Sequence, residues 1–343
     1  MRFYRVMRVL APEALRVALD AKDWCVLDAL LDDPRQPMSS IANACGLSRQ
    51  SAEYRIRKLE DAKLIPGYRT IINIRKLGYA SYHVFINLHD PAHEELLRER
   101  AQKSPWVNAV ITYDGIYGFE ISIMARSAAE FTTHYHDLIN GIRIIDDEPL
   151  IILETVKADT LPKKFIKKRA VHRHDAVPAK VIEYAPDASD MRIMKLLADD
   201  ASLTKTALAK HVGLSNDAVA YRLKKLMASK HIVQFRPIIN YDVLGLSIQG
   251  VLLKVNYASE RYKEFDAFQR GTDGIIWSAK TFGTFDYIIY VLTRNVGEFH
   301  DLFREVKRRF GDIIERYELL YAHTQYKYTF MADIIAQPPS TPR

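Results

Sequence analysis

The chain has only two cysteines in 343 residues, Cys25 and Cys45. Two cysteines build neither a disulfide framework nor a zinc site, and such low usage is typical of a reducing cytoplasm. No apolar run approaches the length of about 18 residues that marks a membrane-spanning helix. We therefore expect a cytoplasmic protein that binds no membrane and holds no structural metal.

Motifs of catalysis are also missing. The sequence has no Gly-rich phosphate loop, no Ser/His/Asp set and no metal-ligand spacing. We therefore expect neither a cofactor nor an enzymatic activity. Lys and Arg number 49 against 42 Asp and Glu, which leaves a net charge of +7 at pH 7. This excess favours an anionic partner such as nucleic acid, although many soluble proteins are as basic without one.

The second half of the chain repeats the first. Residues 23–78 and 190–245 are identical at 20 of 56 positions without a gap, at an offset of 167 residues. After one inserted residue the correspondence continues, with Gly115 matching Gly283. So long a period indicates a duplicated pair of domains, because solenoid repeats run at roughly 20–50 residues. Neither cysteine is repeated, so the fold does not depend on them.

Each repeat opens with three predicted helices. In the first repeat the second helix, 39–45, ends at Gly46, and Ser48 then stands where a helix N-cap belongs. Apolar residues at i, i+4 and i+7 give the third helix one buried stripe, Ala52, Ile56 and Leu59. The second repeat keeps all of these features, as Gly213, Ser215, Val219, Leu223 and Leu226. A helix, a tight glycine turn and an N-capped helix are the signature of a helix-turn-helix.

The rest of each repeat is rich in β-branched and aromatic residues. Predicted strands and helices follow in the order β-α-β-β-α-β, which is that of a ferredoxin-like sandwich. The predicted fold class is α+β, with two winged/helix-turn-helix domains, each followed by a ferredoxin-like βαββαβ sandwich. The expected segments are an N-terminal extension 1–22, helix-turn-helix domains 23–66 and 190–233, αβ domains 67–157 and 234–335, and a basic linker 158–189.

The two segments outside the repeats are basic. The linker carries Lys163, Lys164, Lys167, Lys168, Arg169 and Arg173. It is either a solvated connection or a strap that contacts DNA phosphates. The first 22 residues hold four arginines, but Pro12, Glu13 and Asp20 argue against a targeting segment. An additional amphipathic helix or an irregular start fits them better.

The order of domains resembles that of the Lrp/AsnC (feast/famine) transcription regulators. The resemblance rests on "GLSRQSAEYRIRKLEDAKLI" at 46–65, "GLSNDAVAYRLKKLMASKHI" at 213–232, Leu77-Gly78, Leu244-Gly245 and "GTFDYIIYV" at 283–291. It covers nearly the whole chain outside the N-terminal segment, the linker and the last few residues. Members of that family carry one copy per chain and dimerise through their αβ domains. The resemblance therefore implies that one tandem chain builds the equivalent of a dimer and associates further as a homo-oligomer.

The third helix of each unit is expected to contact double-stranded DNA. In a helix-turn-helix this helix lies in the major groove, with its N-terminal residues against base edges. Opposite the buried stripe lie Gln50, Glu53, Tyr54 and Arg57, matched by Asp217, Ala220, Tyr221 and Lys224. The flanks carry Arg55, Lys58, Arg222 and Lys225, which suit phosphates, while Ser48 and Ser215 expose helix N-terminal amides. The alternative is a charged, solvated helix face.

The base-reading positions differ between the repeats. Arg49 corresponds to Asn216, Gln50 to Asp217 and Glu53 to Ala220. Gln and Arg pair with adenine and guanine, whereas Asp accepts only from cytosine and repels phosphate. We hypothesise that the two halves read different half-sites. The alternative is that the second reader binds little DNA and serves as a scaffold.

The resemblance also implies a small effector, usually an amino acid, at the loop between the second and third strands of an αβ domain. The matching residues are Gly283, Thr284 and Asp286. The first repeat has Gly118 where the acid would stand, so an ammonium group would find its acceptor only in the second half. The alternative is that Gly283 and Asp286 only shape a β-turn.

Two other functions stay open. The same architecture resembles that of siroheme decarboxylases, and histidines of the first αβ domain could contact a tetrapyrrole: His83, His89, His93, His134 and His136. Against this, the counterparts of His83 and His134 are Gly250 and Leu302. The other alternative is a DNA-organising protein, whose affinity would depend on salt but hardly on sequence.

Overall fold

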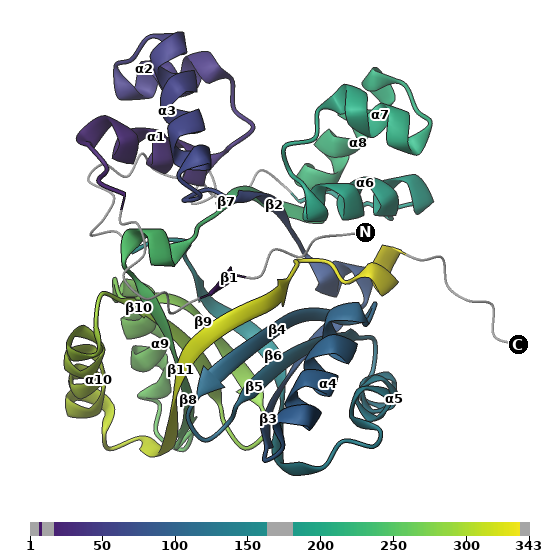
Figure 1. Ribbon diagram of the computed structural model, residues 1–343. Coiled ribbons are helices and arrows are strands. Elements are labelled where there is room, and N and C mark those ends of the chain that lie inside the picture. The colour runs from purple at the N-terminus through teal and green to yellow at the C-terminus, as the bar shows by residue number, and fades with distance from the viewer. Residues whose placement is uncertain (1–6, 9–16, 163–180, 337–343) are drawn as a thin grey trace, which may run out of the picture. The chain divides into compact units, whose positions relative to one another are not determined.

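The computed structural model describes residues 7–8, 17–162 and 181–336. They fall into two compact units. One unit contains the described parts of 1–16, 80–165 and 241–328, and the other contains those of 17–79, 166–240 and 329–343. The basic residues of the linker and most of the N-terminal extension lie outside the described residues, so the structure does not address the strap or the extension. Figure 1 gives the labels of the elements.

Both helix-turn-helix domains belong to one unit. Their helices are α1 (Ala21–Asp32), α2 (Met38–Cys45) and α3 (Arg49–Asp61), then α6 (Ala188–Asp199), α7 (Lys205–Val212) and α8 (Asn216–Ala228). Gly46 and Gly213 follow α2 and α7 with φ of 58° and 71°, a left-handed conformation that glycine adopts without a Cβ clash. The Oγ atoms of Ser48 and Ser215 then accept the amide N–H three residues on, at 3.2 Å. Both predicted turns and caps are confirmed.

A two-stranded antiparallel ribbon connects the two helix-turn-helix domains. It consists of β2 (Gly67–Ile72) and β7 (Ile232–Ile238), with Thr70 opposite Phe235. The predicted β-α-β-β-α-β order includes neither strand. The overlooked signal is the repeated apolar pair in "RTIIN" and "RPIIN". Among the described residues, each of these short strands pairs with the strand of the other repeat. The short helices η1 (Ile74–Leu77) and η3 (Tyr241–Leu244) follow the two strands.

The other unit holds both βαββαβ sandwiches, as predicted. The first comprises β3 (Ala80–Leu88), α4 (Pro91–Lys103), β4 (Val107–Asp114), β5 (Phe119–Ala125), α5 (Ala128–Ile139) and β6 (Ile144–Ala158). The second comprises β8 (Ser247–Val255), α9 (Tyr262–Gly271), β9 (Ile275–Phe282), β10 (Tyr287–Thr293), α10 (Val296–Phe310) and β11 (Ile314–Tyr328). Their sheet orders, β4-β5-β3-β6 and β9-β10-β8-β11, are the same. Figure 1 shows α4 and α5 outside the first set of strands and α9 and α10 outside the second.

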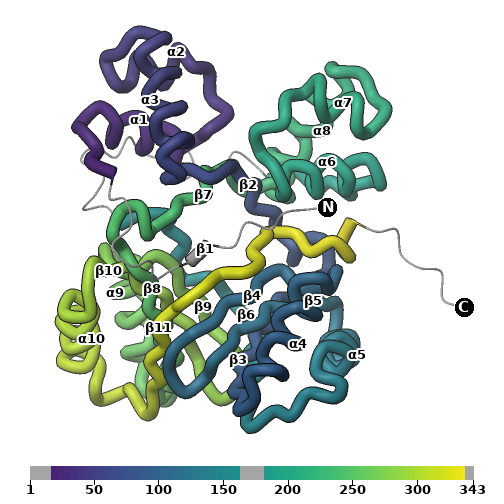
Figure 2. The backbone as a smooth tube through the Cα atoms, in the orientation of Figure 1, coloured from purple at the N-terminus to yellow at the C-terminus, as the bar shows by residue number. Residues whose placement is uncertain are grey.

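The two sheets join into one closed sheet because their last strands are shared. The first half of β6 pairs with β3 and the second half with β9, changing partner at Ile151. Strand β11 does the same with β8 and β4, changing partner at Tyr321. Met7 and Arg8, which form β1, add a short pairing to β11. The tube in Figure 2 lets the reader follow β6 and β11 through both sheets.

Three apolar cores fill this unit. One lies against α4 and α5 and includes Leu97 and Leu138, and a second lies against α9 and α10 and includes Phe265 and Phe303. The third lies between the two sheets and includes Phe85, Tyr113, Tyr117, Leu252, Phe285 and Leu320. An eight-stranded closed sheet has an interior just wide enough for side chains to fill, and this core fills it from both repeats. None of the described helices is both long and apolar enough to cross a membrane.

A matched pair of buried lysines ties each sandwich to the other. The Nζ atom of Lys157 on β6 donates to the Thr272 carbonyl at 2.5 Å, at the end of α9. The Nζ atom of Lys327 on β11 donates to the Ser104 carbonyl at 2.7 Å, at the end of α4. A cation beside the last carbonyls of a helix also complements the helix dipole. Each repeat therefore caps a helix of the other.

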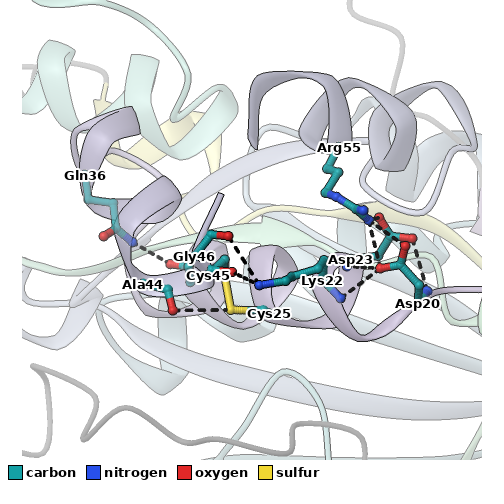
Figure 3. The surroundings of a disulfide bond; sticks show 10 residues. Asp20, Lys22, Asp23, Cys25, Gln36, Ala44, Cys45, Gly46 and Arg55 are labelled. Atoms are coloured by element: carbon teal, nitrogen blue, oxygen red, sulfur yellow. Dashed lines mark hydrogen bonds and ion pairs between the residues drawn. A yellow bond between two sulfur atoms is a disulfide. The ribbon is translucent and has the colours of Figure 1, made fainter. Parts of the chain in front are cut away.

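The two cysteines are joined by a disulfide. Cys25 on α1 and Cys45 on α2 lie with their Cα atoms 5.7 Å apart (Figure 3). The expectation of a chain without a disulfide was wrong, because the helix-turn-helix fold packs α1 against α2 and brings these two positions together. The counterparts of the cysteines in the second repeat are Arg192 and Val212. The second domain therefore has no equivalent cross-link.

Candidate nucleic-acid interface

Helices α3 and α8 each present one buried and one exposed face. The predicted stripes are buried: Ala52, Ile56, Leu59, Val219, Leu223 and Leu226. Of the predicted reading face, Gln50, Arg57, Asp217 and Lys224 are exposed, and Glu53 and Ala220 are half-buried. Tyr54 and Tyr221, at matching positions, expose 66% and 60% of their surface. Both faces are thus free to meet a partner.

The first turns of α3 and α8 differ in their local contacts. In α3 the Arg49 Nε atom lies 2.9 Å from Glu53 Oε1, and the Arg49 side chain remains 75% exposed. Such a surface ion pair contributes little free energy and can rearrange when DNA binds. In α8 the Asn216 side-chain amide donates to Thr206 Oγ1 at 3.4 Å. Before any DNA binds, Arg49 and Asn216, which are both predicted to read bases, therefore contact different side chains.

A buried aspartate anchors α3 to the start of α1. Asp23 has a side chain that is 0% exposed, and it accepts from Arg55 Nη1 at 2.6 Å and from Lys58 Nζ at 2.7 Å. Arg55 also donates to Asp20, which forms a capping box with Asp23 at the start of α1 (Figure 3). The hydrogen bond from Arg55 lowers the pKa of Asp20 to about 2. Burial acts to raise the pKa of Asp23, but hydrogen bonds from Lys58, Asp20 and Arg55 leave it below its ordinary value.

The second domain repeats the aspartate and the arginine but not the lysine. Arg222 Nη1 lies 2.7 Å from Asp187 and 2.9 Å from Asp190, whose side chain is 0% exposed. The Tyr184 hydroxyl donates to Asp190 in place of a lysine. Burial and that hydrogen bond raise the pKa of Tyr184 to about 12. Lys225, the counterpart of Lys58, instead lies over the rings of Tyr221 and Tyr184, at 4.6 and 5.2 Å.

These contacts bear on the residues predicted to bind phosphates. Arg55 and Arg222 make the same contact in both repeats, since each binds a buried aspartate at the start of the first helix of its domain. Lys58 is engaged in the same way, whereas the ammonium of Lys225 lies on aromatic rings at the protein surface. Phosphate contacts by Arg55, Lys58 and Arg222 stay predictions, and each would compete with an intramolecular ion pair.

The residues predicted to bind an effector form the turn between β9 and β10. Gly283 has φ of 152°, and a Cβ there would lie 2.8 Å from the Pro149 carbonyl oxygen. The Thr284 N–H donates to Glu148 at 3.2 Å, and Asp286 Oδ2 accepts the Val255 N–H at 2.9 Å. Gly283 and Asp286 therefore both shape this turn, as the alternative reading expected. Effector binding there stays a prediction.

A buried carboxylate that the sequence analysis did not single out lies between the two sheets. Glu120 on β5 accepts from the Tyr290 hydroxyl of β10 at 2.6 Å, and its Oε1 lies 2.5 Å from His83 Nδ1. The Tyr113 hydroxyl donates to its other oxygen. Burial and the Glu120 carboxylate hold the pKa values of Tyr113 and Tyr290 well above their ordinary range. The signal was an acidic residue inside the apolar strand "FEISIMA".

The histidines considered for a tetrapyrrole site do not share one face. His83 is directed to Glu120 and lies 6.1 Å from the Trp277 ring, on the side of the core between the sheets. His134 on α5 stacks on Trp106 at 4.0 Å, on the opposite side of the first sheet. His93 lies at the start of α4 beside Asp90. The structure thus separates His83 from the helix-borne histidines.

Comparison with known proteins places this geometry in a family. The family model of the AsnC-type helix-turn-helix domain matches residues 19–60, and that of a winged helix-turn-helix DNA-binding domain matches residues 186–229. The leucine-responsive regulatory protein of Rhizobium meliloti (strain 1021) is 32% identical over 120 residues, which are 34% of this chain and 77% of that protein. The chain belongs to the Lrp/AsnC family. Two separate helix-turn-helix matches agree with a tandem duplication of the family unit.

Lrp/AsnC relatives are shorter than this chain. The HTH-type transcriptional regulator LrpA of Pyrococcus horikoshii is 30% identical over 144 residues, which are 99% of that protein but 40% of this chain. A solved structure that spans both repeats is that of the siroheme decarboxylase NirDL. It covers 91% of this chain and 94% of its own, with a TM-score of 0.61 and 14% identity. At that identity the likeness shows a shared fold.

Proposed function

We propose that this Lrp/AsnC chain is a sequence-specific transcription regulator that binds double-stranded DNA through α3 and α8. The observation that carries the proposal is the pair of exposed, N-capped helix faces within one compact unit. The contact residues in the first domain are Ser48, Arg49, Gln50, Glu53, Tyr54, Arg55, Arg57 and Lys58. In the second domain they are Ser215, Asn216, Asp217, Tyr221, Arg222, Lys224 and Lys225. Base edges are read from the N-terminal turns, and phosphates are held by the basic flanks.

The two readers select unlike half-sites. Gln50 and Arg49 favour adenine and guanine, whereas Asp217 accepts only from the amino group of cytosine. The Arg49–Glu53 ion pair has no counterpart in α8, where Ala220 replaces the acid. Lys225 lies over the rings of Tyr221 and Tyr184, while Lys58 is held by Asp23. The operator for one chain is therefore asymmetric.

A footprint on the DNA upstream of the chain's own gene tests this function. Random-sequence DNA serves as competitor, because a specific regulator keeps its protection when non-specific sites are in excess. We expect protection that survives the competitor and covers two unlike half-sites. Protection lost to any competitor contradicts sequence-specific regulation and favours a DNA-organising role. Two equivalent inverted half-sites contradict the asymmetric operator alone.

An amino-acid effector at the turn of the second sandwich is the second part of the proposal. Asp286 Oδ2 is held by the Val255 N–H and lies 3.9 Å from Lys254, so Oδ1 is the oxygen that an ammonium group would bind. Gly283 and Thr284 supply the backbone beside it. Isothermal titration with single amino acids tests this site. We expect the parent protein to bind an amino acid and Asp286→Asn to bind none. The first-repeat variant Gly118→Ala, at the counterpart position, should bind it as the parent does.

We further propose a cytoplasmic homo-oligomer. The αβ domains already pair within the chain, so association between chains uses other surfaces. Sedimentation measured across a range of concentrations tests the oligomer. A monomer at all concentrations contradicts it.

A second candidate function is tetrapyrrole decarboxylation. It is favoured by the NirDL-like fold and by the buried pair of His83 and Glu120 between the two sheets. Titration of the protein with siroheme, followed by absorption, separates the candidates. We expect no shift of the siroheme spectrum. A saturable shift that His83→Ala removes would support the enzyme instead.

A further inference from the structure

The two helix-turn-helix domains touch each other through more than the β2–β7 ribbon. Ribbon side chains bind the C-terminal carbonyls of the first helix of each domain. Gln234 Nε2 donates to the Leu31 carbonyl at 3.1 Å, and Arg69 Nη1 donates to the Ala198 carbonyl at 3.4 Å. The two acceptors, Leu31 and Ala198, stand at equivalent positions of the repeats. The donors do not, because the counterpart of Gln234 is Gly67 and that of Arg69 is Arg236.

Arg35 adds a contact that is made only once. It lies in the loop between α1 and α2, and its Nη1 atom donates to the Ala201 carbonyl at 2.6 Å and the Leu203 carbonyl at 2.8 Å. Both carbonyls belong to the loop between α6 and α7 of the other domain. The Arg35 guanidinium also lies 5.1 Å from the centre of the Phe235 ring, on β7. One side chain thereby spans the first domain, the second domain and the ribbon.

The loop that receives Arg35 is itself fixed. The Ala201 N–H donates to the Tyr68 carbonyl of β2 at 3.0 Å, and Ala201 is 1% exposed. Burial lowers the pKa of Arg35, with Asp33 and Asp200 opposing, but an arginine stays charged at any physiological pH. A planar guanidinium that bonds two carbonyls and stacks on a ring loses its geometry when replaced. The counterpart of Arg35 in the second repeat is Ser202, which is too short for the reciprocal contact.

We infer that Arg35 is a positioning residue that fixes α3 relative to α8, and that it thereby sets the one half-site spacing that the chain accepts on DNA. This inference rests on the proposed function. Adding two base pairs between half-sites turns the second one by roughly 70° about the DNA axis, since a turn holds about 10.5 base pairs. Two DNA-binding domains that can move relative to each other would tolerate that change of spacing. Two domains that Arg35 holds in one arrangement would not.

The first experiment measures, in the absence of DNA, how far Arg35 restricts the position of α3 relative to α8. Spin labels are attached to cysteines replacing Asp61 and Ala228, the matched last residues of α3 and α8, in a Cys25→Ser/Cys45→Ser background. Double electron–electron resonance then gives the distribution of distances between the labels. We expect one narrow distribution for the parent and a clearly broader one for Arg35→Ser. Equal widths overturn the inference, whether or not the protein binds DNA.

The second experiment measures the spacing preference. The full chain is titrated with operators whose half-sites are separated by the native spacing or by one to four additional base pairs. The parent should lose about tenfold or more in affinity at two added base pairs, the scale of one lost base contact. Arg35→Ser should flatten this profile. Arg192→Ser, on the exposed surface of α6, removes the same charge elsewhere and should keep the profile of the parent.

The outcomes separate this inference from the proposed function. A parent protein that binds every DNA equally contradicts the proposed function. A parent that prefers one operator but shares its spacing profile with Arg35→Ser overturns only the role of Arg35. If Arg35→Ser does not fold, Arg35→Lys keeps the charge but cannot reproduce the forked contact. We then expect a profile that is flatter than that of the parent, and an unchanged profile counts against the inference.

Discussion

The two helix-turn-helix domains share an anchor and differ in what completes it. In each, an arginine of the recognition helix binds an aspartate at the start of the first helix. Lys58 completes this site in the first domain, whereas Tyr184 completes it in the second and Lys225 lies over the rings of Tyr221 and Tyr184. Two lysines that are identical in the aligned sequence therefore have different tasks. Sequence identity between the repeats shows that they are related. The role of each lysine has to be read from its contacts in the structure.

The largest difference should come from the disulfide, which only the first domain has. Cys25 and Cys45 close a loop of 20 residues, and a cross-link of that size stabilises a fold by about 3 kcal/mol. Reduction should therefore lower the amide exchange protection of α1–α3 far more than that of α6–α8. Native-state hydrogen exchange with and without reductant measures this. The variant Cys25→Ser/Cys45→Ser should no longer respond to reductant, and equal losses in both domains would contradict the expectation.

Removing the buried aspartates should give the next largest effect. Asp23→Asn leaves two cations without their carboxylate and should cost about 2 kcal/mol, less than for a fully buried pair because both cations are partly exposed. Asp190→Asn should cost less, because the Tyr184 hydroxyl can still donate to the amide oxygen. Urea unfolding at pH 7 measures both. A larger loss for Asp190→Asn would reverse the comparison.

The same aspartate predicts a dependence on pH. The folded pKa of Asp23 lies below its ordinary value, so its stabilising effect is complete above the unfolded pKa of about 3.9 and is lost as pH falls through the folded value. The parent should therefore lose stability on acidification below about pH 4, and Asp23→Asn should lose less. Thermal unfolding from pH 7 down to pH 2 measures the difference. Parallel curves for the two proteins would sink this explanation.

Lysine substitutions should separate binding from folding. Lys225→Ala should weaken DNA binding and reduce the slope of log affinity against log salt by about 1, as for one lost phosphate contact. Lys58→Ala should reduce that slope by less, because Asp23 already holds the Lys58 ammonium, and should lower the thermal stability of the first domain. Fluorescence anisotropy at several salt concentrations, beside melting curves, measures both. The reverse pattern would mean that Lys58 leaves Asp23 when DNA binds.

The smallest effect should come from the reading face of α8. Asp217→Asn removes a negative charge from the helix face proposed to meet DNA and should raise the affinity for random-sequence DNA about threefold at 0.1 M salt. Gln50→Glu introduces that charge in α3 and should lower this affinity by a similar factor. Titrations of both variants with the same random-sequence DNA give the two ratios. A lower affinity of Asp217→Asn for random-sequence DNA would contradict the repulsion between Asp217 and phosphates.

The fold was largely predictable because duplicated patterns support one another. The glycine turn, the N-cap serine and the buried stripe each occur in both repeats. A pattern that occurs at equivalent positions of two diverged repeats is less easily explained by chance than one that occurs once. The β2–β7 ribbon was missed because each strand is short and carries no alternation of its own. The ribbon forms between residues far apart in the chain, such as Thr70 and Phe235, and no local pattern encodes that pairing.

The candidate site was less predictable than the fold. Helical spacing correctly separated the buried and exposed faces of α3, but it could not tell that Arg55 turns back to Asp20 and Asp23. Long polar side chains choose partners after the domain has packed. The disulfide was missed for the same reason, since the distance between Cys25 and Cys45 follows from how α1 lies on α2.

The closed sheet also constrains how the chain is made. One edge of β4 cannot pair until β11 has been synthesised, because Ala109 pairs with Tyr328 near the other end of the described chain. A ribosome adds about 5–20 residues per second, so an edge of β4 stays open for on the order of 10–40 seconds after it emerges. Open edges invite pairing with the wrong strand. The newly made protein is therefore most vulnerable to aggregation between the synthesis of its two halves, and slower translation there would lengthen that interval.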